Sequence, residues 1–177
     1  MNSIYMIARK IYIHIFSIIY TFFLKLIGVK IGKNNLFLSK IIIRGNPKNI
    51  VIGNRCRIQK GVCFNVIRDG KIILGDDVLI GDYTIISSSS NIKIDNGTEC
   101  AAFCYIVDHD HDTRFTNSVG QDIYIGENTW LGTKVTILKG VSIHKESVVG
   151  ANSVVTKSFS STSLIAGTPA KLIKELR

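Results

Sequence analysis

Residues 125–155 read IGENTWLGTKVTILKGVSIHKESVVGANSVV, and an aliphatic side chain stands at every sixth position of this stretch. The series is Ile125, Leu131, Ile137, Ile143, Val149 and Val155. An α-helix repeats every 3.6 residues and a β-strand every two, so neither alone produces a strict period of six. One aliphatic residue in six is the signature of a parallel β-helix. The stretch therefore predicts an all-β fold of this class.

The period also predicts the shape of one turn of the solenoid. Six extended residues make a flat side about 20 Å long, and three such sides close a triangular coil. The large aliphatic residue fills the interior, and a smaller residue four positions later turns inward at the corner, where little space is left. The expected corner residues are Thr129, Val135, Val141, Ser147 and Ser153.

The same register continues towards the N-terminus with looser corners, which gives about six coils. Their expected inward residues are Ile31, Phe37 and Ile43; Ile52, Ile58 and Phe64; Leu74, Ile80 and Ile86; Ile94, Cys100 and Ile106; Ile125, Leu131 and Ile137; and Ile143, Val149 and Val155. The long step between the fourth and fifth coils predicts one protruding loop at about residues 107–122. We expect residues 29–177 to form the β-helix domain, ending in a short C-terminal helix.

Charge is distributed unevenly along the chain. The net charge is +9, yet residues 1–68 contain 12 of the 22 Lys and Arg residues and no Asp or Glu. Such asymmetry indicates an anionic partner, for example a membrane surface. The basic region shows no recognised nucleic-acid-binding module, so nucleic acid is not expected as a partner.

Residues 1–28 are expected to form an apolar, basic helix. The longest stretch without Asp, Glu, Lys or Arg, residues 11–24, is shorter than the roughly 20 residues that a membrane span needs. No convincing signal-peptide cleavage site follows it. Two compatible interpretations remain: a lid on the first coil, or an interfacial helix through which residues 1–27 contact a membrane surface.

The four cysteines fit structural positions. Cys56 and Cys104 fall at small corner positions and Cys100 at an inward position, where a thiol acts as a small core filler. The sequence contains no CxxC motif, which argues against a metal or redox role.

The predicted loop begins with the sequence VDHDHD at residues 107–112. His-x-His places two rings on one face of a strand, which could serve a metal, but a third ligand is hard to supply from the rest of the chain. A solvated polar loop is the second interpretation. The third, which we favour, is a general base, because imidazole accepts a proton near neutral pH.

Together these motifs resemble the hexapeptide-repeat acyltransferases, in the maltose/galactoside acetyltransferase-like branch that includes polysaccharide O-acetyltransferases. The resemblance covers residues 31–171, and it is most specific in DHDH at 108–111, IGENTWLG at 125–132, VGANSVVTK at 149–157 and IAGTPAK at 165–171. It implies left-handed winding, a homotrimer with active sites between neighbouring subunits, and acetyl-CoA as donor, with no metal.

The resemblance also implies site residues. An ungapped alignment of the coil before the loop places the family's catalytic histidine on His111, with His109 as the runner-up on the same face. The acetyl-CoA site would contain Trp130, Gly132, Thr133, Ala151, Thr156, Lys157 and Lys171. A backbone N–H near Gly132 or Thr133 would stabilise the oxyanion.

For the acceptor, Asp82, Tyr83 and Ser89 are the candidate contacts. In the galactoside enzymes an Asn and an Asp of the coil before the loop contact the sugar. The same register gives Gly81 and Ser89 here, which argues against a simple maltose or galactoside acceptor.

The expected function is therefore an O-acetyltransferase that moves acetyl from acetyl-CoA to a sugar hydroxyl of a bacterial surface polysaccharide or its lipid-linked precursor. The expected location is cytoplasmic, at the inner face of the cytoplasmic membrane. The alternatives are an acyltransferase for another small acceptor, such as an amino sugar or antibiotic, and a non-catalytic β-helix that serves in assembly. A γ-type carbonic anhydrase shares the fold but needs a histidine triad that this sequence does not easily supply.

Overall fold

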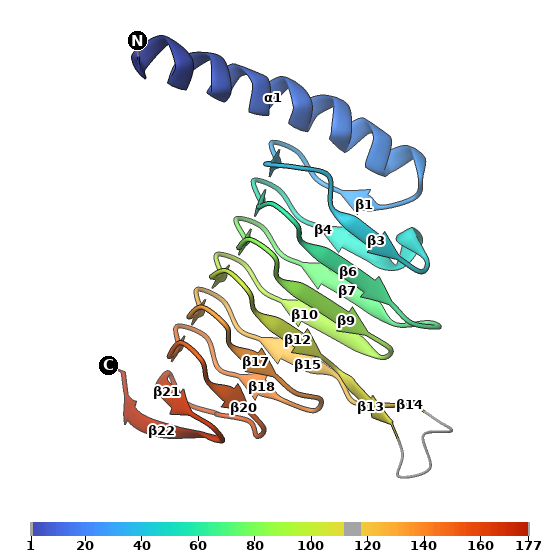
Figure 1. Cartoon of the computed structure of the whole chain (residues 1–177). Coiled ribbons are helices and arrows are strands. Elements are labelled where there is room, and N and C mark those ends of the chain that lie inside the picture. Colours follow the sequence, from blue (N-terminus) through green and yellow to red (C-terminus); the bar gives the residue numbers. More distant parts are fainter. Residues whose placement is uncertain (1, 112–117, 177) are drawn as a thin grey trace.

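The computed structural model describes residues 2–111 and 118–176. The chain forms a stack of triangular coils beneath a single long helix (Figure 1). Parallel strands of successive coils build three sheets, here called sheets A, B and C, which are the three sides of the stack. The predicted parallel β-helix is confirmed, and the solenoid is consistent with left-handed winding.

The strands are short, as expected when each side of a coil is six residues long. Sheet A contains β1 (Lys30–Ile31), β4 (Ile50–Ile52), β7 (Lys71–Leu74), β10 (Asn91–Ile94), β15 (Ile123–Ile125) and β18 (Ser142–Ile143). Sheet B contains β2 (Leu36–Phe37), β5 (Arg57–Ile58), β8 (Leu79–Ile80), β11 (Glu99–Cys100), β16 (Trp130–Leu131), β19 (Val148–Val149), β21 (Ser163–Gly167) and β22 (Ala170–Glu175). Sheet C contains β3 (Ile42–Arg44), β6 (Cys63–Val66), β9 (Ile85–Ser88), β12 (Tyr105–Val107), β17 (Thr136–Ile137) and β20 (Val154–Val155). A 3₁₀-helix, η1 (Pro47–Asn49), precedes β4.

The register predicted from the period of six is confirmed in every coil. Each expected inward residue pairs with its counterpart in the next coil; Phe37 pairs with Ile58, for example. Pairing also continues across the long insertion, where Ile106 of β12 lies beside Ile137 of β17. Ile31 and Ile43 of the first coil are partly buried, and the other inward residues are buried.

Corner residues of successive coils are tied together by backbone hydrogen bonds. Between sheets B and C, Tyr83 and Phe103 both have positive φ, which is unusual for a bulky side chain. Tyr83 donates its amide to the Lys60 carbonyl, and Phe103 donates to the Asp82 carbonyl. The backbone hydrogen bond that recurs at these corners offsets the conformational cost of the positive φ. The expected small residues fill the inner side of the corners, and Thr129, Val135, Val141, Ser147 and Ser153 are all buried.

Helix α1 (Asn2–Leu26) covers the open end of the first coil. Leu24 is fully buried, and two buried polar side chains anchor the helix. Ser17 Oγ accepts a hydrogen bond from the Phe37 amide at 2.9 Å, and Tyr20 Oη accepts one from the Ile41 amide at 3.0 Å. The helix ends at Leu26, and the positive φ of Gly28 lets the Val29 amide donate back to the Leu24 carbonyl. In this structure α1 therefore lies over the first coil.

The opposite end of the stack differs from the prediction. The expected C-terminal helix is wrong, because residues 163–175 form an antiparallel hairpin of β21 and β22. Ile165 continues the inward series by pairing with Val149, so the chain begins a further coil side. Gly167, Thr168 and Pro169 then reverse it. Gly167 adopts positive φ, as a tight turn requires, and proline favours extended or turn backbone over the interior of a helix.

The predicted excursion between the fourth and fifth coils is confirmed. It contains an antiparallel pair, β13 (His109–His111) and β14 (Ser118–Gly120), that projects from the side of the stack (Figure 1). Gln121 donates its amide to the Asp108 carbonyl at 2.7 Å and so closes the base of the excursion. This closure holds Asp108 and His109 at the point where the chain leaves sheet C.

Candidate active site

Asp108 follows directly after β12, and the strand alternation decides where its side chain lies. Ile106 points inward and Val107 outward, so Asp108 turns back into the corner, where it is fully buried. Its carboxylate accepts three hydrogen bonds from residues 88–90: from Ser88 Oγ at 2.6 Å, the Ser89 amide at 2.7 Å and the Ser90 amide at 3.0 Å. The SSSS stretch at residues 87–90 thus forms a fixed cradle for a buried acidic side chain.

The imidazole ring of His109 contacts this carboxylate. Its ring Nδ1 lies 3.1 Å from Asp108 Oδ1, and its side chain is only 11% exposed. An ionised carboxylate can only accept, so Nδ1 carries the hydrogen in the neutral ring. Nε2 then holds the lone pair and can accept a proton. A carboxylate that fixes the tautomer and orientation of a histidine in this way is the arrangement used in general-base catalysis.

A cavity of about 320 Å³ opens in front of His109. It is lined by Tyr105, Val107, His109, Asp110, Leu138 and Lys139. Lys139 Nζ lies 3.9 Å from Asp110 Oδ2, so a cation and a carboxylate flank the imidazole at the mouth of the cavity. The site therefore combines an oriented base with charged groups that could hold a polar ligand.

A second cavity of about 450 Å³ continues along the outer face of sheet C. Tyr105 lines both cavities, which together form what we call the sheet C groove. Arg44, Asn65 and Ser87 occupy equivalent outward positions in three successive coils, and Asn65 Nδ2 donates to Ser87 Oγ at 2.8 Å. The groove thus offers a cation, an amide and a hydroxyl beside aromatic rings.

Comparison with known proteins identifies the class of this solenoid. Residues 122–157 match the family described as bacterial transferase hexapeptide (six repeats). WbbJ of Escherichia coli K12, assigned as an O-acetyl transferase of lipopolysaccharide biosynthesis, is 33% identical over 144 residues, which are 73% of this chain and 74% of WbbJ. The chain belongs to the hexapeptide-repeat acyltransferases.

This acyltransferase resembles one further curated relative in sequence and one solved structure in fold. WcaF of Escherichia coli K12, assigned as an acetyltransferase of colanic acid biosynthesis, is 31% identical over 156 residues, which are 87% of this chain and 73% of WcaF. AntD, an N-acyltransferase from Bacillus cereus solved with dTDP and 3-hydroxybutyryl-CoA, shares the fold with a TM-score of 0.78 at 24% identity, over 87% of each chain. The acyltransferase family inferred from the sequence motifs is confirmed.

The acyltransferase chain places the residues expected to bind the acetyl donor in separate regions. Trp130 is exposed on sheet B, and Gly132, Thr133 and Ala151 lie at the corner between sheets B and C. Lys171 lies on β22. Thr156 and Lys157 instead follow β20 at the corner between sheets C and A, the corner that contains His109. Within one copy of the chain, the corner with Thr133 and Ala151 and the corner with Thr156 and Lys157 therefore lie apart.

The two backbone amides expected to stabilise the oxyanion, those of Gly132 and Thr133, differ in their hydrogen bonding. The Gly132 amide donates to the Val149 carbonyl at 2.8 Å, because it belongs to the ladder of sheet B. Thr133 Oγ1 donates to the Ala102 carbonyl at 2.8 Å, which fixes the corner beside the Thr133 amide. Thr133 is therefore the better candidate of the two.

The three residues expected to contact the acceptor have different roles in the structure. Tyr83 lines the sheet C groove and stacks on Phe103 with ring centroids 5.4 Å apart. Asp82 Oδ1 accepts a hydrogen bond from the Lys60 amide at 2.8 Å, so it caps a corner. Ser89 donates its amide to Asp108, which gives it a role in positioning that carboxylate.

The backbone of His111 pairs with Ser118 in the excursion, but the His111 side chain lies outside the described residues. In the part of the chain that the structure describes, no group of three or more His, Cys, Asp or Glu residues could hold a metal ion.

Sequence reasoning missed Arg44, Asn65, Tyr105 and Lys139. The pairing register of successive coils could have identified them. Because Ile137 pairs with Ile106, the residues that follow Ile137 must lie beside those that follow Ile106, which places Lys139 next to the Asp108–His109 segment. Arg44 and Asn65 each follow an inward residue by one position and therefore point outward on sheet C.

Proposed function

We propose that this acyltransferase moves an acetyl group from acetyl-CoA to a hydroxyl of a sugar, with His109 as the general base. The buried Asp108 carboxylate, which orients His109 towards the sheet C groove, is the observation that carries the proposal. The sequence register favoured His111. We assign His109 because three fixed donors hold the carboxylate that orients its ring.

The proposed reaction needs two proton transfers, both through His109, and no acyl-enzyme. His109 Nε2 takes the proton of the acceptor hydroxyl as the oxygen attacks the thioester carbonyl. The tetrahedral oxyanion is stabilised by a backbone N–H, for which Thr133 is the candidate. The C–S bond then breaks, and the imidazolium returns the proton to the CoA thiolate. A positioned base of this kind contributes about 10²- to 10⁴-fold in rate.

The acetyl donor is supported by the relatives. WbbJ and WcaF are assigned as acetyltransferases, and AntD was solved with an acyl-CoA. Lys157 and Lys139 at the corner that contains His109 are suitable partners for the CoA phosphates. No metal is part of the proposal.

The complete site is proposed to form between copies of the chain in a homotrimer. Support comes from the division of the site residues, because His109 and Lys157 lie at one corner while Thr133 and Ala151 lie at another. A closed ring of three subunits would place the first corner of one copy against the second corner of its neighbour.

Subunit mixing tests this arrangement. We expect His109→Ala and Thr133→Pro to be inactive alone, because each removes one half of the site. Trimers reassembled from both variants contain a boundary that has neither substitution, and they should recover part of the activity. Mixed trimers that remain as inactive as either parent would show that one copy supplies the whole site.

The acceptor is proposed to be a sugar of a bacterial surface polysaccharide or its lipid-linked precursor. WbbJ and WcaF are assigned to such pathways, and the hydrogen-bonding groups of the sheet C groove suit a hydroxyl-rich ligand. Arg44 in this groove could in addition bind a phosphate or carboxylate of the acceptor.

N-acylation of an amino sugar is the second candidate, and the fold match to AntD favours it. AntD was also solved with dTDP-4-amino-4,6-dideoxyglucose. Thiol release from acetyl-CoA, measured with a panel of hydroxyl acceptors and the matching amino sugars, separates the two functions. Turnover only with amino sugars would overturn the O-acetyltransferase proposal.

A further inference from the structure

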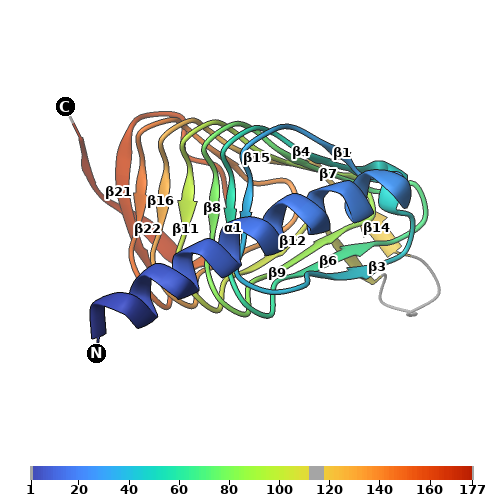
Figure 2. The ribbon, with the colours of Figure 1, turned by 90° about the horizontal axis from the view of Figure 1, so that it is seen from above.

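The side of α1 that faces away from the coils is apolar over residues 11–26. Its large side chains recur at intervals of three and four residues, so they share one face. They are Ile11, Ile15, Ile18, Ile19, Phe22 and Leu26, each more than half exposed. The side that faces the first coil contains Ser17, Tyr20 and Leu24 instead. The N-terminal part of α1 projects past the first coils in both views (Figures 1 and 2).

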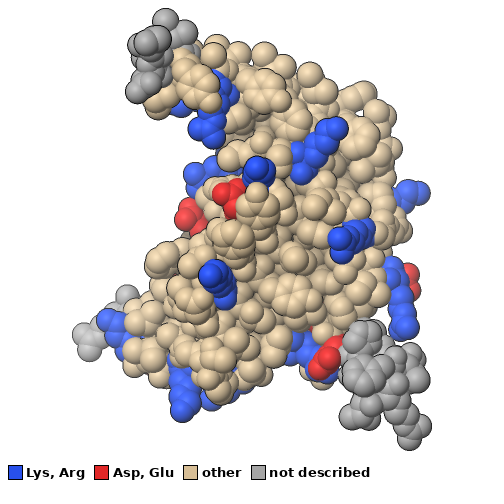
Figure 3. All heavy atoms as spheres, viewed as in Figure 1, with Lys and Arg blue, Asp and Glu red and all other residues tan. Residues whose placement is uncertain are grey.

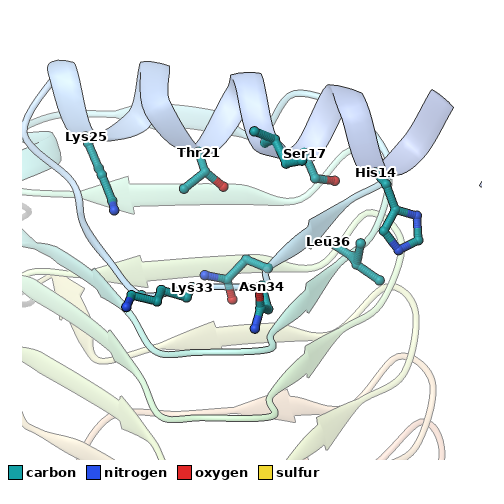
Figure 4. A pocket seen from close by; sticks show the side chains of 10 residues that line it. His14, Ser17, Thr21, Lys25, Lys33, Asn34 and Leu36 are labelled. Atoms are coloured by element: carbon teal, nitrogen blue, oxygen red, sulfur yellow. The ribbon is translucent and has the colours of Figure 1, made fainter. Parts of the chain in front are cut away.

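Charge around this face has a single sign. The chain contains no Asp or Glu before Asp69, and Lys10 and Lys25 lie on one flank of α1. Lys25 and Lys33 border a groove of about 470 Å³ between that flank and the first coil, together with His14 and Thr21 (Figure 4). In Figure 3 the helix at the top of the molecule shows tan and blue spheres and no red ones.

We propose that α1 lies in the surface of a bilayer that contains anionic lipids. An apolar face that enters the acyl boundary, with lysines at the level of the headgroups, is the composition of an interfacial helix. The absence of carboxylates from the first 68 residues supplies the charge complementarity, because a neighbouring carboxylate would repel the lipid phosphates. This inference does not depend on the acyl transfer reaction.

Length alone would permit α1 to cross a membrane, since Tyr5–Leu26 forms a 22-residue apolar segment. The contacts of its inner face favour an orientation parallel to the bilayer. Ser17 and Tyr20 accept hydrogen bonds from amides of the first coil, and Leu24 is fully buried against it. A helix inserted across the bilayer would lose these contacts and leave two buried amides without acceptors.

This orientation fixes the height of the active site. His109 follows the fourth coil, three strand spacings from the first coil, and α1 adds one helix diameter. With strands about 4.8 Å apart and a helix about 10 Å across, the imidazole stands roughly 25 Å from the bilayer. The sheet C groove would then open sideways above the membrane surface.

Co-sedimentation of the full chain with vesicles tests the proposal. Vesicles of phosphatidylcholine mixed with phosphatidylglycerol should bind the wild type, and high salt or phosphatidylcholine alone should weaken the binding. Ile18→Glu combined with Phe22→Glu changes two exposed residues of the outer face, 72% and 65% exposed. We expect the partition coefficient to fall by about tenfold or more.

Leu172→Glu combined with Ile173→Glu is the matched control, because it adds the same charge at the opposite end of the stack. It should bind vesicles as the wild type does. Circular dichroism checks that both variants are folded, and thiol release with a soluble acceptor should be unchanged in both. Equal vesicle binding by the two double variants would overturn the proposal. So would a wild type that ignores vesicles but forms a larger assembly that Ile18→Glu/Phe22→Glu dissociates, since α1 would then cover a second copy.

Discussion

Asp108 Oδ1 lies 3.1 Å from His109 Nδ1, and the same carboxylate is fully buried beneath the imidazole. The two residues are adjacent in sequence, yet they face different environments because strand alternation turns one inward and the other outward. The solenoid corner thus builds an oriented base from two consecutive residues. The functional account depends on this pair.

Asp108→Asn should preserve the packing and remove the tautomer control. An amide can donate as well as accept, so Nδ1 no longer needs to carry the hydrogen, and Nε2 is no longer held as the acceptor. We expect kcat to fall by about 10²-fold or more, with KM for acetyl-CoA near the wild-type value. Steady-state kinetics over a range of pH measures this effect.

Ser88→Ala is the graded control for Asp108→Asn, because it removes one of the three donors to the carboxylate. Its loss of kcat should be smaller than that of Asp108→Asn. If both variants keep the wild-type kcat and pH profile, Asp108 has a structural role only.

Arg44→Ala tests the sheet C groove. Arg44 lines the groove away from His109, so its loss should raise KM for the acceptor and leave KM for acetyl-CoA and kcat nearly unchanged. Lys93→Ala changes a cation on sheet A, outside the groove, and should have no effect on either KM. A rise in KM for acetyl-CoA instead would assign the groove to the donor.

Tyr20→Phe tests how α1 is attached. The substitution removes the acceptor of the buried Ile41 amide, and we expect it to lower the free energy of unfolding by about 1–3 kcal/mol. Tyr12→Phe removes a hydroxyl from an exposed position of the same helix and should change stability by less than about 0.5 kcal/mol. Urea denaturation compares the two. Equal stability would mean that the contact of Tyr20 with the first coil contributes nothing.

Stability should fall at alkaline pH because of the buried thiols. Burial raises the pKa of Cys56 to about 11 and also raises the pKa of Cys100 and Cys104. Unfolded thiols lose their protons near pH 8.5. Between the pKa of an unfolded thiol and the raised pKa of Cys56, the folded state binds more protons than the unfolded state. The free energy of unfolding therefore decreases as pH rises from about 9 to about 11.

Urea unfolding of the wild type and of Cys56→Ala checks this linkage. The alanine variant should show a shallower decrease over the same pH range, because one of the shifted groups is absent. Identical slopes would show that the Cys56 thiol titrates alike in the folded and unfolded chain.

The sequence predicted the stack of coils residue by residue because each coil repeats the same packing problem. A single large residue per side fills the interior, so the positions of Ile52, Ile58 and Phe64 were determined once Ile125, Leu131 and Ile137 were assigned. The C-terminal prediction failed where this repetition stops. There the turn at Gly167–Pro169 decided between a helix and a hairpin, and the apolar pattern alone did not distinguish them.

The site was only partly accessible from sequence. The Asp108–His109 segment was located, but the choice between His109 and His111 depends on which ring a buried carboxylate orients, and the sequence pattern alone does not show that. The sheet C groove was missed because Arg44, Asn65 and Ser87 come from three different coils. Such a groove is visible only when the outward positions are aligned as carefully as the inward ones.

Thiol release from acetyl-CoA with a glycan acceptor mixture, compared among wild type, His109→Ala and His111→Ala, tests the central claim most directly. Our account predicts that His109→Ala loses about 10²- to 10⁴-fold of the activity while His111→Ala stays close to wild type. Loss of activity in His111→Ala alone, with His109→Ala active, would contradict the assignment and identify His111 as the base.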